Sequence, residues 1–186
     1  MIRSVEAESP LIQSESSILV MIDFQERLVP AMAERERLLE NAIRLARISG
    51  ILGLPVLVTE QQKLGATVPE LREALGTVDP VSKLEFNGFG SEAFAEKVKS
   101  FRRNTLILAG IEAHICVAQT ALHAVPYYRV HVVADAVSCR APQNRDIALR
   151  RMEQAGVVPT STEMVIYELL GKAGTEEFRE VLKLVK

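Results

Sequence analysis

The chain has 186 residues, a hydrophobic fraction of 48% and a formal net charge of −2. This length and composition fit one domain with a substantial core. The near balance of 22 basic and 24 acidic residues gives no electrostatic reason to expect nucleic acid or an anionic membrane as a partner.

Residues 1–17 are polar and acidic and lack the apolar centre of a signal peptide. We expect them to form an N-terminal arm that precedes a single domain over residues 18–186. No apolar run approaches the ~20 residues that a membrane span requires. Two cysteines do not make a disulfide framework, so a cytoplasmic protein is expected.

Strands and helices alternate along the rest of the chain. Residues 18–22 are continuously apolar, which is typical of a strand covered on both faces, and residues 34–52 carry the apolar stripe of a helix. This rhythm predicts a three-layer α/β/α Rossmann-like sandwich with a mostly parallel sheet of roughly six strands. The other expected strands are 55–59, 81–84, 105–109, 128–134 and 157–160, and the other expected helices are 69–75, 91–101, 115–125, 143–155, 162–171 and 175–185.

The carboxyl ends of parallel strands are where such sheets bind ligands. Several chemically active side chains fall at these ends, so a carboxylate, an ammonium and a thiol are expected to meet at one edge. They are Asp23, Glu60, Lys83, Cys116 and Asp135, with Cys139 and Arg140 beyond the last.

Cys116 is the most informative of these residues. It follows the break at Gly110 and precedes a helical pattern, which predicts a thiol in the first turn of a helix. Unpaired N–H groups and the helix dipole favour a thiolate there. A thiolate is a strong nucleophile, and the same N–H groups can hold an oxyanion.

Four stretches together resemble the isochorismatase-like cysteine hydrolase family. They occur in the order and at the spacing of that family, and the segments Thr59–Gln61 and Val68–Leu71 are similar to its isochorismatase domain-containing branch. The four stretches are Ile18–Gln25, Ser82–Phe86, Gly110–Val117 and Val133–Arg140.

The resemblance implies a catalytic triad of Asp23, Lys83 and Cys116. Cys116 would be the nucleophile, Asp23 would take the thiol proton, and Lys83 would hold Asp23 and favour the thiolate by its charge. It also implies a cis peptide between Ile111 and Glu112. This bond would aim the backbone N–H of Glu112, together with that of Cys116, at a substrate oxyanion.

Nicotinamidases of the same superfamily bind a metal through an Asp and two His residues beyond the second strand. Here Glu60-Gln61-Gln62-Lys63 follows that strand, and no histidine precedes His114. We therefore expect no metal site and no cofactor.

Three further residues are candidate substrate contacts, namely Gln25, Glu60 and Phe86. Gln25 has an equally good alternative as a cap of the chain after the strand, and a structural role is favoured for Glu60. Phe86 lines either a pocket or a subunit interface. His114 is expected to pack or to hydrogen-bond to backbone rather than to form a dyad with Cys116.

The main hypothesis is a cofactor-free hydrolase of an amide or related acyl group on a small molecule. One alternative is a thiol redox or sensing protein that uses Cys116 with Cys139, which is otherwise a packed bystander. Another is a non-catalytic scaffold of the same fold. Relatives of this fold assemble, so a homo-oligomer (a dimer, a tetramer or larger) is expected.

Overall fold

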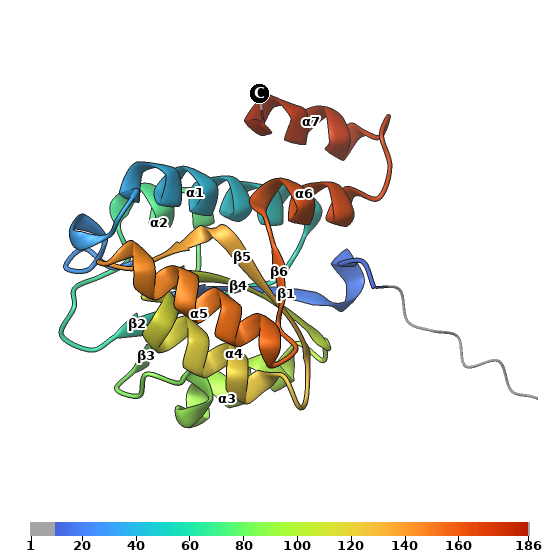
Figure 1. Cartoon of the computed structure of the whole chain (residues 1–186). Helices are drawn as coiled ribbons and strands as arrows, with labels where there is room; N and C mark the ends of the chain where they lie inside the picture. Colours follow the sequence, from blue (N-terminus) through green and yellow to red (C-terminus); the bar gives the residue numbers. More distant parts are fainter. Residues whose placement is uncertain (1–9, 186) are drawn as a thin grey trace, which may run out of the picture.

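The computed structural model describes residues 10–185 (Figure 1). Within this range six strands form one sheet in the order β3-β2-β1-β4-β5-β6, and every paired neighbour is parallel. The strands are β1 Ser17–Ile22, β2 Val56–Gln61, β3 Val81–Lys83, β4 Thr105–Ile111, β5 Arg129–Ser138 and β6 Val158–Thr160.

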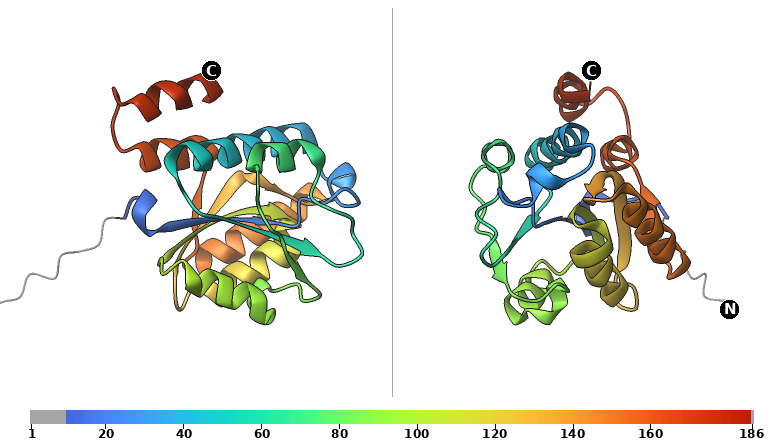
Figure 2. Two further views of the ribbon diagram at one scale, coloured as in Figure 1. Left: turned by 180° about the vertical axis from the view of Figure 1, so that it is seen from behind. Right: turned by 60° about the vertical axis from the view of Figure 1, so that its left-hand side comes forward.

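Helices cover both faces of this sheet, which confirms the predicted three-layer α/β/α class. Figures 1 and 2 show α1, α2 and α6 on one face and α3, α4 and α5 on the other, with α7 outside α1 and α6. Their bounds are α1 Arg35–Leu52, α2 Pro69–Leu75, α3 Glu92–Ser100, α4 Ala118–Ala124, α5 Pro142–Gln154, α6 Thr162–Leu170 and α7 Glu176–Val185.

The central strand β1 shows why its sequence is apolar without interruption. Side chains alternate between the two faces of a strand, and both faces of this one are buried. Ile18, Val20 and Ile22 join the core beneath α3, α4 and α5, whereas Leu19 and Met21 join the core beneath α1, α2 and α6. Burial of both faces therefore requires an apolar residue at every position.

Three strands run further than the sequence indicated, and one of them is β2, which continues to Gln61 and so places Glu60 inside the strand and not at its end. β4 continues to Ile111 and β5 to Ser138, so Asp135 lies inside β5 and not at its end. Its carboxylate Oδ1 accepts hydrogen bonds from the backbone N and the hydroxyl of Thr162, at 2.8 and 2.9 Å. Asp135 therefore caps the start of α6 and has no place in the predicted site.

The described part of the predicted N-terminal arm packs against the domain. Ile12 is 1% exposed, and its backbone N donates to Glu168 Oε2 at 2.8 Å. Residues 1–9 lie outside the described residues, and the boundary at residue 17 stays a prediction, as does the single domain over residues 18–186. No helix within residues 10–185 is long and apolar enough to cross a membrane.

Gly110 lets β4 lie close to β1. Its φ is +150°, and a Cβ at this position would lie 2.4 Å from the carbonyl oxygen of Ile22. No side chain fits there without movement of the backbone that leads into Asp23. The glycine is therefore a geometric requirement for joining the two strand ends.

We expect Gly110→Ala to lower the free energy of unfolding by at least about 2 kcal/mol, because it combines a strained φ with a backbone clash. Chemical denaturation measures the effect. The matched control is Gly50→Ala in α1, where a Cβ meets nothing within 4 Å; it is expected to stabilise by about 0.5–1 kcal/mol. Equal effects at both positions would contradict the packing argument.

Candidate active site

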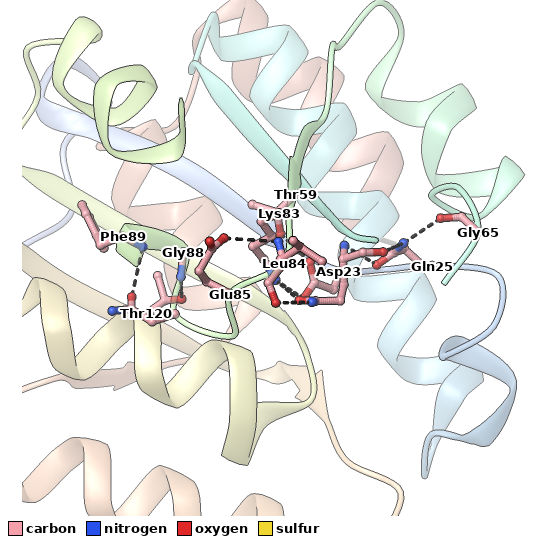
Figure 3. A network of polar contacts seen from close by, with 12 residues as sticks. Asp23, Gln25, Thr59, Gly65, Lys83, Leu84, Glu85, Gly88, Phe89 and Thr120 are labelled. Atoms are coloured by element: carbon pink, nitrogen blue, oxygen red, sulfur yellow. Dashed lines mark hydrogen bonds and ion pairs between the residues drawn. The ribbon is translucent and has the colours of Figure 1, made fainter. Parts of the chain in front are cut away.

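Asp23 follows β1 directly and adopts a left-handed backbone with φ 56°. Its backbone N donates to the carbonyl oxygen of Thr59 at 3.2 Å. Its carboxylate is fully buried and accepts two hydrogen bonds (Figure 3), from Thr59 Oγ1 at 2.7 Å and from Lys83 Nζ at 2.7 Å. Two neighbouring strands therefore fix the position of this acid.

Lys83 is the last residue of the edge strand β3. Its side chain is 0% exposed, and Nζ donates both to Asp23 and to Gln61 Oε1, the latter at 2.8 Å. Gln61 is held in turn, because its Nε2 donates to the carbonyl oxygen of Leu84. A buried charge is costly unless it is paired and hydrogen-bonded, and here each charge neutralises the other.

Cys116 lies in η4, a π-helical turn over Ala113–Val117 that precedes α4. The thiol therefore lies in the first turn of a helix, as predicted, and that turn is π-helical and continues directly into α4. The thiol is 7% exposed and interacts with the side chains of both Asp23 and Lys83. It opens on a cleft of about 90 Å³ whose lining residues are Asp23, Leu28, Gln61, Leu64, Phe86, Glu112, Ile115 and Cys116.

The predicted preference for a thiolate is wrong for this protein at rest. Burial raises the pKa of the Cys116 thiol from 9.0 to about 12, and the Asp23 carboxylate raises it further than Lys83 lowers it. An unpaired lysine would have favoured the thiolate, but this one is already neutralised by the carboxylate. The Cys116 sulfur is thus held as a thiol beside a carboxylate.

The peptide bond between Ile111 and Glu112 is cis in the structure. The side chain of Glu112 points into an ion pair, with Arg140 Nε at 3.1 and 3.2 Å and the backbone N of Arg140 at 3.0 Å. The Glu112 carboxylate is therefore engaged by the side chain and the backbone of Arg140.

Gln25 does not line the cleft. Its amide is completely engaged, since Nε2 donates to the carbonyl oxygens of Gln61 and Gly65 at 2.9 and 2.6 Å, and Oε1 accepts from Gln61 N at 2.8 Å (Figure 3). The side chain is 0% exposed. Of the two interpretations left open for Gln25, the structure matches the cap and not the substrate contact.

Glu60 also faces away from the cysteine. Successive side chains of β2 alternate in direction, so Thr59 and Gln61 reach the Asp23–Lys83 pair while Glu60 points to a separate cavity of about 310 Å³. Its carboxylate accepts from the backbone N and the hydroxyl of Thr67 at 2.7 and 2.8 Å. The structure thus removes Glu60 as a substrate contact.

Phe86 does line the cleft and is 54% exposed, so it stays a candidate substrate contact. Thr59 and Gln61 belong to the site although the sequence did not single them out for it. The period of two along β2 was the available signal, because it places both on the face opposite to Glu60.

His114 turns away from Cys116. Its Nδ1 lies 3.1 Å from Cys139 Sγ, and its Nε2 lies 3.4 Å from Asn144 Nδ2. Both cysteines are free thiols. One donor atom from each of Glu112, His114 and Cys139 lies within 4.8 Å of the others, so these three side chains can hold a metal ion.

A parallel α/β/α sheet with a thiol beside a buried acid–lysine pair at its carboxyl edge places the protein among the isochorismatase-like α/β hydrolases. The comparison with protein families agrees, because the model described as the Isochorismatase domain matches residues 17–164. The chain belongs to the isochorismatase family. Isochorismatase domain-containing protein 2A of Mus musculus is 37% identical over 175 residues, which cover 92% of this chain and 84% of the relative.

Solved structures share the whole fold. A MAR1 ribonuclease from Caenorhabditis elegans is 36% identical with a TM-score of 0.87, covering 94% of this chain and 92% of that one. YcaC from Pseudomonas aeruginosa, solved with hexane-2,5-diol and covalent acrylamide, is 27% identical with a TM-score of 0.88, covering 94% and 91%. YcaC from Escherichia coli, an octameric hydrolase of unknown specificity, shares the fold at 24% identity, with a TM-score of 0.85 and coverage of 96% and 89%.

Alkylation of Cys116 by iodoacetamide should follow the raised pKa of its thiol. The alkylation rate is expected to rise about tenfold per pH unit from pH 7 to 10 without a plateau. The thiolate fraction continues to grow over this range because the pKa of the thiol is about 12. Peptide mapping by mass spectrometry separates Cys116 from Cys139. A plateau below pH 8 would contradict the described electrostatics.

Loss of one partner of the Asp23–Lys83 pair should leave an uncompensated buried charge. Lys83→Met is expected to cost about 3–5 kcal/mol of unfolding free energy. The double variant Asp23→Asn with Lys83→Met should cost clearly less than the sum of the single changes. The control Lys99→Met, at an exposed position of α3, should stay within about 0.5 kcal/mol. Strict additivity in the double-mutant cycle would contradict a direct ion pair.

Proposed function

We propose that the protein is a cysteine-dependent hydrolase that acts on an amide or related acyl group of a small molecule through Asp23, Lys83 and Cys116. The observation that carries this proposal is the thiol at the cleft, in contact with a fully buried carboxylate–lysine pair. Three separate strand ends bring these groups together, which a purely structural role does not require.

In the proposed reaction the Cys116 sulfur attacks the carbonyl carbon and its proton passes to Asp23. The developing oxyanion is held by the backbone N–H groups of Glu112 and Cys116. The tetrahedral intermediate collapses to a thioester, and Asp23 returns the proton to the leaving amine or alcohol. A water then attacks the thioester, giving its proton to Asp23, and the thiol is re-formed as the acid leaves.

Lys83 has an indirect part in this scheme. Its ammonium pairs with the buried Asp23 carboxylate, which accepts the thiol proton in the proposed reaction. When the proton moves to Asp23, the lysine is left beside the developing negative charge, which it stabilises. The pKa of the Cys116 thiol is about 12, and the proposed reaction does not require a thiolate in the resting protein. The sulfur loses its proton as it attacks the carbonyl carbon.

The size and lining of the cleft support a small acyl substrate. The cleft has a volume of about 90 Å³ and apolar walls from Leu28, Leu64 and Ile115, which suit a short apolar group next to the reacting carbonyl. The P. aeruginosa relative was solved with covalent acrylamide, which is compatible with a reactive nucleophile in a protein of this fold.

RNA cleavage, the activity in the name of the C. elegans relative, is less well supported. The chain carries a net charge of −2, and the lysine at the cleft is already paired with Asp23. Phosphodiester binding relies on accessible cations. A redox pair of Cys116 with Cys139 is likewise less favoured, because Cys139 is 0% exposed and contacts His114.

The expected small-molecule substrate, the homo-oligomer and the cytoplasmic location stay predictions. The octameric state of E. coli YcaC supports assembly of this chain. Exposed apolar side chains near the cleft and in the turn after α4, among them Phe86 and Tyr127, supply surface for such contacts.

The decisive test uses p-nitrophenyl acetate as a generic acyl donor. We expect release of nitrophenolate together with an acetyl adduct on Cys116 in the intact-mass spectrum. Cys116→Ala should abolish the adduct and the catalysed turnover, and Asp23→Asn should slow turnover by about 10²–10⁴-fold because the base is lost. Circular dichroism shows whether each variant remains folded.

The matched control is Asp146→Asn at an exposed position of α5, which should turn over like the parent protein. Full activity of a folded Cys116→Ala variant would refute the proposed nucleophile. Reversible formation of a Cys116–Cys139 disulfide under mild peroxide, without any acyl adduct, would favour the redox alternative. An inert Cys116 in both assays would favour a scaffold.

A further inference from the structure

A second cluster of ionisable side chains lies where β4 and β5 end. It comprises the Glu112 carboxylate, the His114 ring and the Cys139 thiol, whose donor atoms all lie within 4.8 Å of one another. The hydrolytic scheme uses the backbone of Glu112 but none of these three side chains. Two of them are buried and the third is half-buried, so the cluster is an enclosed one.

The combination of donors is selective. A carboxylate oxygen, an imidazole nitrogen and a thiolate sulfur are the ligands of Zn²⁺, whereas Mg²⁺ and Ca²⁺ prefer oxygen alone. We propose that Glu112, His114 and Cys139 bind a zinc ion, with water as a fourth ligand. This proposal departs from the sequence-based expectation of no metal site, which rested on the missing histidines after the second strand.

The distances require only small shifts. His114 Nδ1 and Cys139 Sγ are 3.1 Å apart, and tetrahedral zinc with its usual bond lengths would hold them about 3.6 Å apart. Burial raises the pKa of the Cys139 thiol, and the backbone N–H groups of His114 and Ala113, which donate hydrogen bonds to the sulfur, offset part of this effect. Zinc replaces the thiol proton, which is released to solvent, and the thiolate and carboxylate together balance its two charges.

Asn144 supplies support from outside the cluster. Its side-chain amide lies 3.4 Å from His114 Nε2. With the amide turned over, its carbonyl oxygen accepts the Nε2 proton and leaves Nδ1 free to bind metal. A ligating histidine characteristically donates its other ring N–H in this way.

In the metal-free protein the Arg140 guanidinium pairs with the Glu112 carboxylate that would bind zinc. Its Nε contacts both oxygens of Glu112, at 3.1 and 3.2 Å. The Arg140 side chain is 64% exposed, so it can swing into solvent and open the carboxylate to an incoming ion. Zinc and the guanidinium therefore compete for Glu112, and this competition separates the proposal from a purely structural cluster.

The test is a titration of the full chain, stripped with a chelator and dialysed, with zinc alone in competition with a chromogenic chelator. We expect one zinc per chain and a higher melting temperature with zinc. Cys139→Ser should weaken binding at least tenfold, and Arg140→Ala should strengthen it several-fold, a gain that misfolding cannot produce. With Co²⁺, a thiolate-to-metal charge-transfer band should appear in the parent and in Cys116→Ser but not in Cys139→Ser.

His123→Asn is the matched control, because it removes an exposed histidine of α4 outside the cluster and should leave zinc affinity unchanged. Absence of stoichiometric binding would overturn the proposal. So would unchanged affinity in folded Cys139→Ser, or loss of binding in Cys116→Ser, since the latter would place the metal at the hydrolytic cleft.

Discussion

The buried ion pair between Asp23 and Lys83 is the interaction on which the site depends. Both side chains are fully inaccessible to solvent, and each is tolerated there because the other and the side chains of Thr59 and Gln61 satisfy it. The pair joins the end of the central strand β1 to the edge strand β3 across β2. It therefore determines both the geometry of three strands and the electrostatic environment of the thiol.

That environment keeps the Cys116 thiol protonated in the resting protein. A helix-terminal cysteine in water would lose its proton readily, but here burial and the adjacent carboxylate oppose ionisation. In the proposed reaction, placing the Asp23 carboxylate next to a protonated Cys116 thiol couples proton transfer to attack. It also limits unwanted oxidation of Cys116, because a thiol reacts with oxidants far more slowly than a thiolate does.

The sequence predicted the architecture well because burial on two faces leaves a clear mark. The continuous apolar run in β1 and the alternation of strands with amphipathic helices were sufficient for the three-layer class. Strand ends were less predictable, since β5 continues through Asp135, whose polar side chain is satisfied by Thr162 of α6. That contact arises only when distant segments come together.

The meeting of the three side chains at one edge of the sheet was predictable, but their electrostatics were not. Asp23, Lys83 and Cys116 are found together at one edge of the sheet, as expected. Gln25 and Glu60 turned out to hold the loop after β2, because hydrogen bonds to Gly65 and Thr67 engage them. Infrared spectroscopy tests the central claim most directly. The experiment uses the Cys139→Ser variant, in which Cys116 is the one remaining cysteine. The account predicts an S–H stretch at neutral pH that disappears on acylation and is absent when Cys116→Ser is added, whereas thiolate absorption in the resting Cys139→Ser protein without that band would contradict it.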